Sequence, residues 1–477
     1  MKRSSGVLMP VSCLYGDYSE GSFGKSAEAF IDFLADAGFS YWQVLPFCMT
    51  DEHNSPYKSM SAFSGNPFFI DIEQLAEEGL ITPEELKESK QYVSYTCEFK
   101  RLWEDRLPLL FLAASRLADF SPVEKFLDEH PYSREFCLFM ARRAANGERP
   151  WHEWTCEETD GATYRAWAFI EYTFHRQWKR IRSYANRKGI SVIGDIPIYV
   201  DYDSADVYFH PEIFDLDEEG RMKGVAGVPP DAFSADGQLW GNPLYNWRAM
   251  KKDGFSWWRD RMRHMLSLFD GVRIDHFRGF DTYFDIPYGA KTAKEGAWRK
   301  GPGRAFVDML RGECGDALII AEDLGERMAS VEKLLSYSKF PGMRILQFAF
   351  DGEAESRHLP HNYSENSVAY TGTHDNNTLL AYVWEADEGK RRELFRYCGY
   401  DGDNLDIGSH AALRTMLASH AALVIFPIQD LLLFGSDTRL NTPGVERGNW
   451  GFRITEEQLA SLDRERLLDL NRLYRRI

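Results

Sequence analysis

Charged and apolar residues alternate in the segment 269–280, where an arginine stands two residues before an aspartate. Val272 and Ile274 are apolar, whereas Arg273 and Asp275 are charged. This alternation is typical of a short strand that buries one side and presents the other. A nearby cation keeps a carboxylate ionised and able to act as a nucleophile. The alternative is a buried Arg–Asp pair that only orders the end of a strand, and the segment alone does not decide between the two.

Three other carboxylates stand at the ends of strand-like apolar runs. They are Asp195, Glu322 and Asp375. Carboxylates repel one another, so several of them gathered at one end of a sheet cost stability and mark function. In a β/α-barrel, catalytic side chains lie at the C-terminal ends of the strands. The four runs therefore predict a barrel that carries its acids on that face.

The four acidic segments, taken in order, resemble the four signature regions of the α-amylase-like glycosidases. They are Gly194-Asp195, Arg273-Ile274-Asp275, Glu322-Asp323-Leu324-Gly325 and His374-Asp375-Asn376-Asn377-Thr378. Narrower motifs resemble one branch, the 4-α-glucanotransferases, also called amylomaltases or disproportionating enzymes (glycoside hydrolase family 77). These motifs occupy residues 55–57, 61–67, 227–231, 237–243, 439–444 and 449–450. The resemblance extends from about Ser5 to Arg453, over nearly the whole chain.

This resemblance implies an α/β fold, a TIM (β/α)8 barrel with helical insertion subdomains. We expect residues 1–477 to form a single catalytic barrel domain. Within it we expect a largely helical insertion over about 72–189 and an active-site loop over about 225–245. The chain itself favours a helix over 24–38 that stops at Gly38. We expect strands at 40–46, 190–197, 343–350, 367–372 and 423–428.

The match to the family motifs also implies catalytic roles. Asp275 is expected to be the nucleophile, Glu322 the acid and base, and Asp375 the third carboxylate, which binds sugar hydroxyls. Retaining glycoside cleavage uses two carboxyl groups about 5 Å apart. Arg273 would keep Asp275 ionised, and the apolar run before Glu322 could bury that residue in part and raise its pKa.

Substrate binding is expected to involve residues from most of the motifs. They are Ser55, Tyr57, Asp195, Gln238, Trp240, Arg273, His276, Phe348, His374 and Asn441. For Asp195, a supporting place at a strand end is as good an interpretation as direct contact with sugar. Gln238 and Trp240 could cover the acceptor and exclude water, which favours transfer over hydrolysis; alternatively, Trp240 only packs its loop onto the barrel. Ala232 stands where family members often carry tyrosine, so one ring contact over the donor would be missing.

The implied activity is transfer of a segment of a 1,4-α-D-glucan to the 4-hydroxyl of an acceptor, by a retaining double displacement. The expected substrates are α-1,4-glucans and malto-oligosaccharides, with glucose as an acceptor. Two alternatives stay open: an α-glucan hydrolase that uses the same carboxylates, and a glucan-binding barrel without catalysis. We expect no cofactor and no metal, because GxGxxG and P-loop motifs are absent and the segment 201–206 lacks the glycine of a calcium loop.

The amino-acid composition limits which binding partners and which cellular compartment we expect. The chain has 73 Asp and Glu against 56 Lys and Arg, for a net charge of −17. This acidic balance argues against nucleic acid and anionic membranes as partners. We find no apolar run of signal-peptide or transmembrane length. Seven cysteines without a CxxC pair suit a reducing environment, so we expect a cytoplasmic protein.

Overall fold

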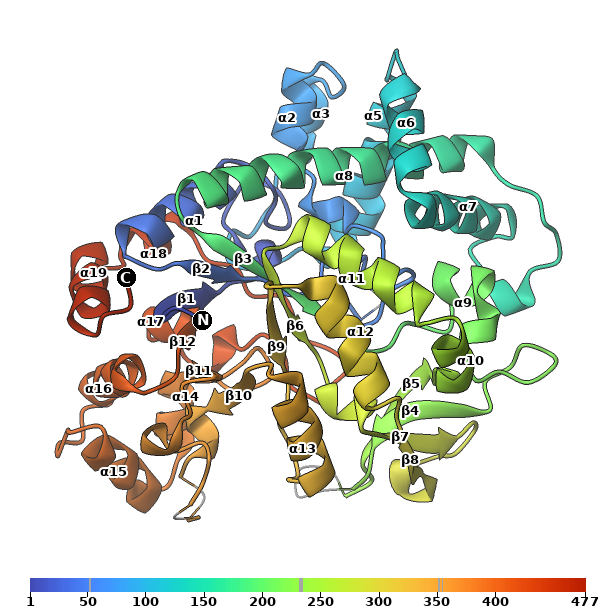
Figure 1. The fold of residues 1–477 in the computed structure, drawn as a ribbon. Coiled ribbons are helices and arrows are strands. Elements are labelled where there is room, and N and C mark those ends of the chain that lie inside the picture. The colour runs from blue at the N-terminus through green and yellow to red at the C-terminus, as the bar shows by residue number, and fades with distance from the viewer. Residues whose placement is uncertain (51–52, 231–234, 351, 354) are drawn as a thin grey trace.

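Eight parallel strands close into a barrel in the computed structural model, which describes residues 1–50, 53–230, 235–350, 352–353 and 355–477 (Figure 1). Neighbouring strands follow chain order, and the last strand pairs with the first. This confirms the predicted fold class. The strands are β1 (Ser4–Leu8), β2 (Tyr41–Gln43), β3 (Ser191–Ile196), β6 (Gly271–Ile274), β9 (Leu318–Ala321), β10 (Gly342–Ile345), β11 (Ser367–Tyr370) and β12 (Leu423–Pro427).

Successive side chains of each barrel strand point alternately outward and inward, and so form two apolar layers, one between the barrel and the helices and one inside the barrel. In β6, Val272 and Ile274 pack in the layer between barrel and helices, as the sequence predicts. Arg273 lies between them and points into the barrel, where it pairs with Asp195 of β3. Below these charges, the barrel is filled by a separate core that includes Leu8, Ile193, Ile320, Met343, Ile345, Val368, Tyr370 and Ile425.

Helices surround the barrel on the outside. The helix predicted over 24–38 is α1, which is followed by Gly38 in a left-handed conformation, with φ of 76°. Among the described residues, no helix is long and apolar enough to cross a membrane. The surrounding helices are α1 (Lys25–Asp36), α8 (Gly161–Arg187), α11 (Ser256–Leu268), α12 (Arg304–Cys314), α13 (Ala329–Ser338), α14 (Leu379–Glu385), α15 (Glu388–Tyr397), α16 (Leu405–Ala418) and α19 (Arg464–Leu473).

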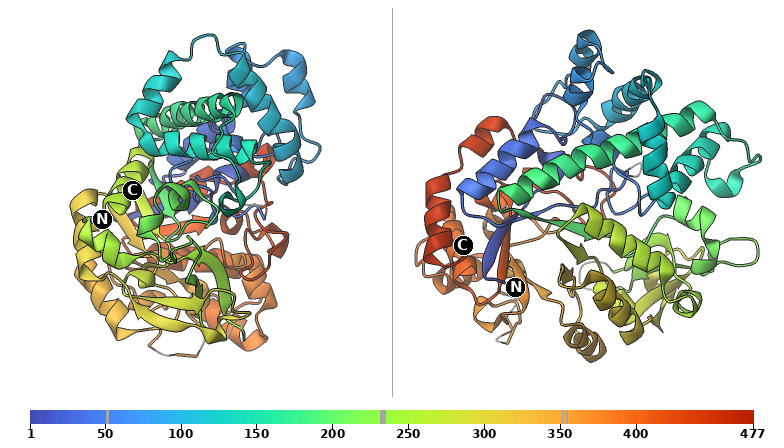
Figure 2. Two further views of the ribbon diagram at one scale, coloured as in Figure 1. Left: turned by 90° about the vertical axis from the view of Figure 1, so that its right-hand side faces the viewer. Right: turned by 45° about the horizontal axis from the view of Figure 1, so that its top comes forward.

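A helical segment separates β2 from β3 and stands at one end of the molecule, above the barrel in the left view of Figure 2. Its long helix α8 joins the two parts. The first half of α8 packs against the inserted helices, and Trp178 in its second half donates a hydrogen bond of 2.8 Å to the Leu268 carbonyl of α11. The inserted helices are α2 (Ile72–Glu77), α3 (Pro83–Glu88), α4 (Phe99–Arg101), α5 (Leu107–Ser115), α6 (Ser121–Glu129) and α7 (Pro131–Ala145).

A second insertion is a four-stranded antiparallel sheet in the order β5-β4-β7-β8, at the lower right of Figure 1. The segment 225–245, expected to be a loop, therefore consists largely of the hairpin β4–β5. The expectation for Ala232 lies outside the described residues, which omit 231–234. The sheet's strands are β4 (Gly224–Val228), β5 (Gln238–Pro243), β7 (Thr282–Pro287) and β8 (Ala297–Lys300). Along the chain, helix α9 (Ala205–Phe209) comes before β4, and helix α10 (Trp247–Lys252) comes between β5 and β7.

All five predicted barrel strands end earlier than the sequence suggests; β2, expected over 40–46, is strand only over Tyr41–Gln43, and β11, expected to residue 372, ends at Tyr370. The run 343–350 is strand only to Ile345, whose N–H binds Nδ1 of His358 at 3.0 Å, and a 3-10 turn, Leu346–Phe348, follows. The run 423–428 ends at Pro427, and its last residue begins the short helix α17 (Ile428–Leu431). Both segments follow directly on a barrel strand, and Gln347 and Phe348 of the first line the cavity at this end of the barrel.

Candidate active site

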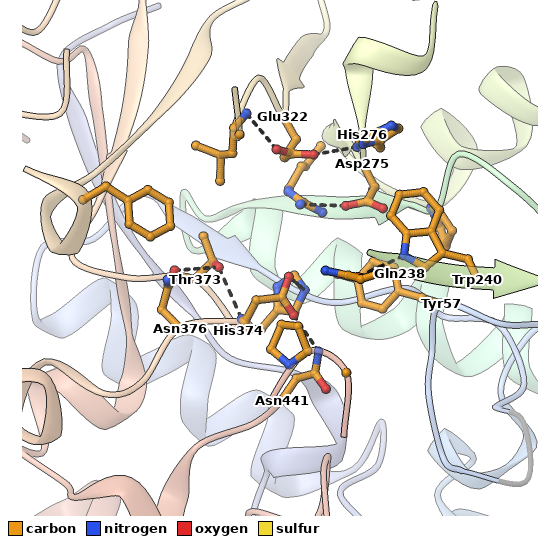
Figure 3. A pocket seen from close by; sticks show the side chains of 18 of the residues that line it. Tyr57, Gln238, Trp240, Asp275, His276, Glu322, Thr373, His374, Asn376 and Asn441 are labelled. Carbon is orange, nitrogen blue, oxygen red and sulfur yellow. Dashed lines mark hydrogen bonds and ion pairs between the residues drawn. The ribbon is translucent and has the colours of Figure 1, made fainter. Parts of the chain in front are cut away.

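A cavity of about 1340 Å³ opens at the C-terminal ends of the barrel strands (Figure 3). Twelve of the thirteen predicted site residues line it: Ser55, Tyr57, Gln238, Trp240, Arg273, Asp275, His276, Glu322, Phe348, His374, Asp375 and Asn441. The exception is Asp195, whose side chain is completely buried. Residues from distant parts of the chain thus meet at one place because the strands that carry them are neighbours in the barrel.

Arg273 lies between two carboxylates at the base of the cavity. Its Nη1 donates to both oxygens of Asp195 at 2.8 Å, and its Nη2 donates to Oδ1 of Asp275 at 2.8 Å. The Tyr57 hydroxyl donates to Asp195 at 2.6 Å. Desolvation opposes the charge of Arg273, but the two carboxylates hold its pKa well above the usual value. Asp195 therefore supports Arg273, which in turn holds the Asp275 carboxylate.

A glycine precedes Asp195 because the helix layer comes very close to β3 at this point. A Cβ built on Gly194 would lie 2.3 Å from the ring of Phe269. The outer side of β3 can therefore carry no side chain here, while Asp195 occupies the inner side. The Gly-Asp motif thus reflects tight packing outside the barrel and a buried ion pair inside it.

Glu322 follows β9 and is held by backbone amides. The N–H of His276 donates to its Oε2 and the N–H of Leu324 to its Oε1, both at 2.8 Å. Desolvation, followed by the negative charge of Asp275, raises the pKa of Glu322 to about 7, although Arg273 and the two amides favour the ionised form. A carboxyl group with this pKa exchanges a proton readily near neutral pH, as an acid that later acts as a base must.

Asp375 sits in a different environment on the opposite wall of the cavity. Nδ2 of Asn441 donates to its Oδ1 at 2.6 Å, and Nε2 of His374 lies 3.3 Å from its Oδ2. Desolvation alone would raise the pKa of Asp375, but these two neighbours bring it below the usual range. The His374 ring stacks on Tyr57 with centroids 5.1 Å apart. This wall therefore presents an ionised carboxylate beside an aromatic face.

Strand β5 brings Gln238 and Trp240 over the cavity, because alternate residues of a strand share one face. The Trp240 indole N–H donates to Oε1 of Gln238 at 3.1 Å, and the Trp240 ring packs edge-to-face on His276 with centroids 5.0 Å apart. Leu239, on the other face, is 43% exposed. Trp240 both lines the cavity and packs its strand onto the barrel, so the two interpretations of this residue are compatible.

The two remaining predicted residues lie at the rim. Phe348, in the turn after β10, packs edge-on to the ring of His358 with centroids 5.5 Å apart. The Ser55 hydroxyl accepts the backbone N–H of Tyr57 at 3.3 Å. Ser55 therefore orders the turn that presents Tyr57, besides lining the cavity.

The sequence reasoning missed one carboxylate that supports the site. Asp430, buried in α17, accepts the backbone N–H of Leu379 at 2.7 Å and the hydroxyl of Thr371 at 2.5 Å. These contacts fix both ends of the segment 371–379, which carries Asp375. Asp430 could have been predicted from the sequence, because it comes after the apolar run of the last barrel strand as the other acids come after theirs.

A metal-binding arrangement is not present in the part of the chain that the structure describes. No group of three or more His, Cys, Asp or Glu side chains there is placed to hold an ion. The charges in the cavity are compensated instead by Arg273, His374 and backbone N–H groups.

Comparisons with known proteins agree with this geometry. The family described as 4-alpha-glucanotransferase matches residues 9–459. The 4-alpha-glucanotransferase of Streptococcus pneumoniae is 42% identical over 499 aligned positions, covering all of this chain and 98% of that protein. That of Thermus thermophilus is 40% identical and covers 96% of each.

Solved structures give the same result. The amylomaltase of Streptococcus agalactiae, in complex with acarbose, superposes with a TM-score of 0.94 at 35% identity and covers 100% of both chains. The amylomaltase of Corynebacterium glutamicum, at 18% identity, shares the fold with a TM-score of 0.83, covering 99% of this chain and 75% of its own.

Proposed function

The chain belongs to the 4-alpha-glucanotransferase family and is a glucan-transferring enzyme, and from this premise we propose how its residues carry out the reaction. The proposal is a retaining double displacement, in which Asp275 is the nucleophile and Glu322 the acid and base. This assignment is supported by the surroundings of the two carboxyl groups. The two carboxyl groups share a wall of the cavity, with Arg273 beside Asp275 and a pKa of about 7 for Glu322.

In the first step, the Asp275 carboxylate attacks the anomeric carbon of the donor. The glycosidic C–O bond breaks, and Glu322 gives its proton to the departing oxygen. The leaving glucan diffuses away with a free 4-hydroxyl, and the rest of the donor stays bound to Asp275 as an ester. Arg273 holds the Asp275 carboxylate in place for the attack through the hydrogen bond from its Nη2.

In the second step, Glu322 acts as a base. The 4-hydroxyl of an acceptor attacks the same anomeric carbon and passes its proton to Glu322, while the ester bond to Asp275 breaks. Each step inverts the anomeric configuration, so the two together retain it. The proton lost by Glu322 in the first step returns in the second, and the enzyme is ready for another cycle.

The opposite wall of the cavity binds the sugar that reacts. Asp375, ionised between His374 and Asn441, accepts hydrogen bonds from sugar hydroxyls and stabilises the positive charge that develops in the transition state. The Tyr57 ring, stacked on His374, offers an apolar surface for the sugar face. Asp195 acts through Arg273 and has no contact with sugar.

The donors are α-1,4-glucans and malto-oligosaccharides, and glucose serves as an acceptor. A cavity of this size, lined by aromatic rings and by polar side chains, suits several linked sugars rather than one. The names of the relatives and the acarbose bound to the Streptococcus agalactiae amylomaltase support this substrate class.

The first alternative from the sequence, a hydrolase with the same carboxylates, is separated from a transferase by one incubation. Purified enzyme with maltotriose should give glucose together with maltotetraose and longer oligomers. A hydrolase would give only maltose and glucose. A product mixture without chains longer than maltotriose would overturn the proposed transfer, and no products at all would favour the non-catalytic barrel.

We further propose that the whole chain works as one catalytic unit in the cytoplasm. The helical segment about 72–189 is docked through α8 onto the barrel rather than tethered to it. All seven cysteines carry free thiols, which suits a reducing compartment.

A further inference from the structure

His276 has an unusual backbone conformation next to the two catalytic carboxyl groups. It is left-handed, with φ of 48° and ψ of 51°, immediately after strand β6 and the residue Asp275. Side chains disfavour this region because the Cβ crowds the following carbonyl. Strain of this kind persists only where the surroundings impose it, and it concentrates at functional sites.

The conformation has a direct consequence for Glu322. Because φ and ψ of a residue orient its own N–H relative to the next one, the left-handed turn lets two consecutive amides reach Glu322: the N–H of His276 donates to Oε2 at 2.8 Å, and that of Phe277 donates to the Glu322 carbonyl at 3.1 Å. Two consecutive N–H groups thus fix both the side chain and the backbone of one residue. In an extended chain successive N–H groups point to opposite sides, so the two could not both face Glu322 if the chain continued straight from β6.

The ring of His276 is clamped between two elements. On one side it receives the edge-to-face contact of Trp240, whose indole is held by Gln238. On the other side lies Gly279, where a Cβ would come within 3.4 Å of Cδ2 of His276. Desolvation lowers the pKa of His276 to about 4, so the ring is neutral at the pH of activity. Its contribution here is therefore shape rather than charge.

We propose that His276 is a positioning residue for Glu322, and that Trp240 of strand β5 holds His276 in the left-handed conformation that keeps its N–H and that of Phe277 directed together at Glu322. This inference rests on the proposed function, because it assumes that Glu322 is the acid and base. It adds that the small antiparallel sheet, by way of one edge-to-face contact, sets the orientation and proton affinity of that group.

The effect on pH dependence follows from the groups that face Glu322. Asp275 favours its protonated form, whereas Arg273 and the N–H groups of Leu324 and His276 favour the ionised form. Losing the His276 N–H removes one of the latter, so the pKa of Glu322 rises. The alkaline limb of the pH profile of kcat/KM, which reports the free enzyme, therefore moves to higher pH.

A matched pair of substitutions separates the backbone of His276 from its ring. His276→Gly and His276→Val both remove the imidazole, but glycine accepts a left-handed backbone whereas a β-branched residue strongly resists it. We expect the alkaline limb of His276→Val to move up by about one pH unit and that of His276→Gly to stay within a few tenths of the wild type. Identical limbs in the two variants would overturn the inference.

A second pair tests the clamp and does not depend on the folding of His276→Val. Trp240→Ala removes the contact with His276, while Leu239→Ala shortens an exposed side chain on the other face of the same strand. We expect the alkaline limb to move upward in Trp240→Ala and to remain unchanged in Leu239→Ala. An unmoved limb in Trp240→Ala would overturn the clamp.

The same assays distinguish this inference from the function on which it rests. If Glu322→Gln slows a natural donor and an activated glycosyl fluoride equally, then Glu322 is not the proton donor and the proposed function itself fails. If Glu322→Gln spares the fluoride while the limbs of His276→Gly and His276→Val coincide, only the positioning role of His276 is lost.

Discussion

At the scale of single residues, the two carboxyl groups proposed to react, those of Asp275 and Glu322, differ because their partners differ. Asp275 receives an N–H of the Arg273 guanidinium, whereas Glu322 receives two neutral backbone amides and faces the negative charge of Asp275. The guanidinium fixes the Asp275 carboxylate, whereas desolvation and the negative charge of Asp275 favour the protonated form of Glu322. Each of the following three predictions changes one part of this arrangement.

Replacing the nucleophile should abolish turnover without unfolding the enzyme. In Asp275→Asn the amide oxygen can still accept the N–H of Arg273, so we expect a melting temperature close to that of the wild type. Because an amide cannot form the covalent intermediate, disproportionation of maltotriose should fall by about 10⁴-fold or more. Near wild-type turnover in this variant would refute the assignment of Asp275.

Replacing the acid should be selective for the leaving group. We expect Glu322→Gln to slow the first step with malto-oligosaccharides by 10²- to 10⁴-fold, since general acid catalysis contributes about that much. The first step with an α-glucosyl fluoride should be largely spared, because fluoride departs without a proton. Single-turnover rates for the two donors measure the difference, and equal losses would mean that another group donates the proton.

The pH profile should report the raised pKa of Glu322. The first step needs this group protonated, and its pKa of about 7 keeps the proton in place to near neutrality. We therefore expect kcat/KM for maltotriose to fall as the pH rises through about 7, with one proton lost. An alkaline limb below pH 5, the range of an ordinary glutamate, would contradict this environment.

At the scale of elements, we propose that strand β5 is the part of the site that favours transfer over hydrolysis. It belongs to the small sheet rather than to the barrel, yet it places Trp240 over the cavity. An aromatic ring there gives an acceptor sugar a surface to stack on and displaces water from the reacting centre. The fate of the covalent intermediate would therefore depend on an element outside the barrel that carries none of the three catalytic carboxylates.

Trp240→Ala should lower the ratio of transferred to hydrolysed glycosyl units by roughly three- to tenfold, since an aromatic contact contributes about 0.5–1.5 kcal/mol. Water and acceptor both pass their proton to Glu322, so any effect on that residue cancels in the ratio. The measurement uses a fixed concentration of maltotriose, with Leu239→Ala as the control. If both rates fall together and the ratio holds, Trp240 only packs the strand or binds donor.

At the scale of the whole molecule, a buried arginine links the first and the last strand of the barrel. The Arg476 side chain is fully buried and donates to six carbonyl groups: those of Ser4 at the start of β1, of Met416, Leu417 and Ser419 at the end of α16, and of Ala421 and Ala422 before β12. It therefore connects the first and last barrel strands with the helix between β11 and β12. No carboxylate takes part in these bonds, so the carbonyl dipoles alone stabilise the charge.

Arg476→Met should destabilise the barrel as a whole. The methionine keeps much of the aliphatic stem but leaves several buried carbonyls unpaired, each of which costs about 1–3 kcal/mol. We expect the free energy of unfolding in urea to fall by about 3 kcal/mol, while kcat at a temperature well below melting stays close to that of the wild type. Arg475→Met, at an exposed neighbouring position, is the matched control, and equal stability of the two variants would refute this role of Arg476.

The sequence by itself determined the family, the barrel fold and which residues gather at the site. The alternation around Arg273 and the acids after apolar runs are local patterns. Such patterns predict strands because they depend only on residues that are close together in the chain. The same holds for α1 and for the left-handed Gly38 that follows it. Twelve of the thirteen predicted site residues consequently line the cavity.

Other features were decided only by the tertiary structure, because they depend on residues far apart in the chain. The hairpin β4–β5 looked like a loop since its partner, β7, lies beyond the next barrel strand. Strand β10 ends at Ile345 because His358 takes its N–H. Asp195 is withdrawn from the cavity by its bonds with Arg273 and Tyr57.

The left-handed backbone of His276 belongs to this second group. The sequence around His276 does not predict this conformation, because a left-handed backbone is expected at a glycine and not at a residue that carries a side chain. It is imposed by Trp240 on one side and by the approach of Glu322 on the other. Local preference can name the residues of a site, but their orientation is set by contacts that form only when the barrel closes.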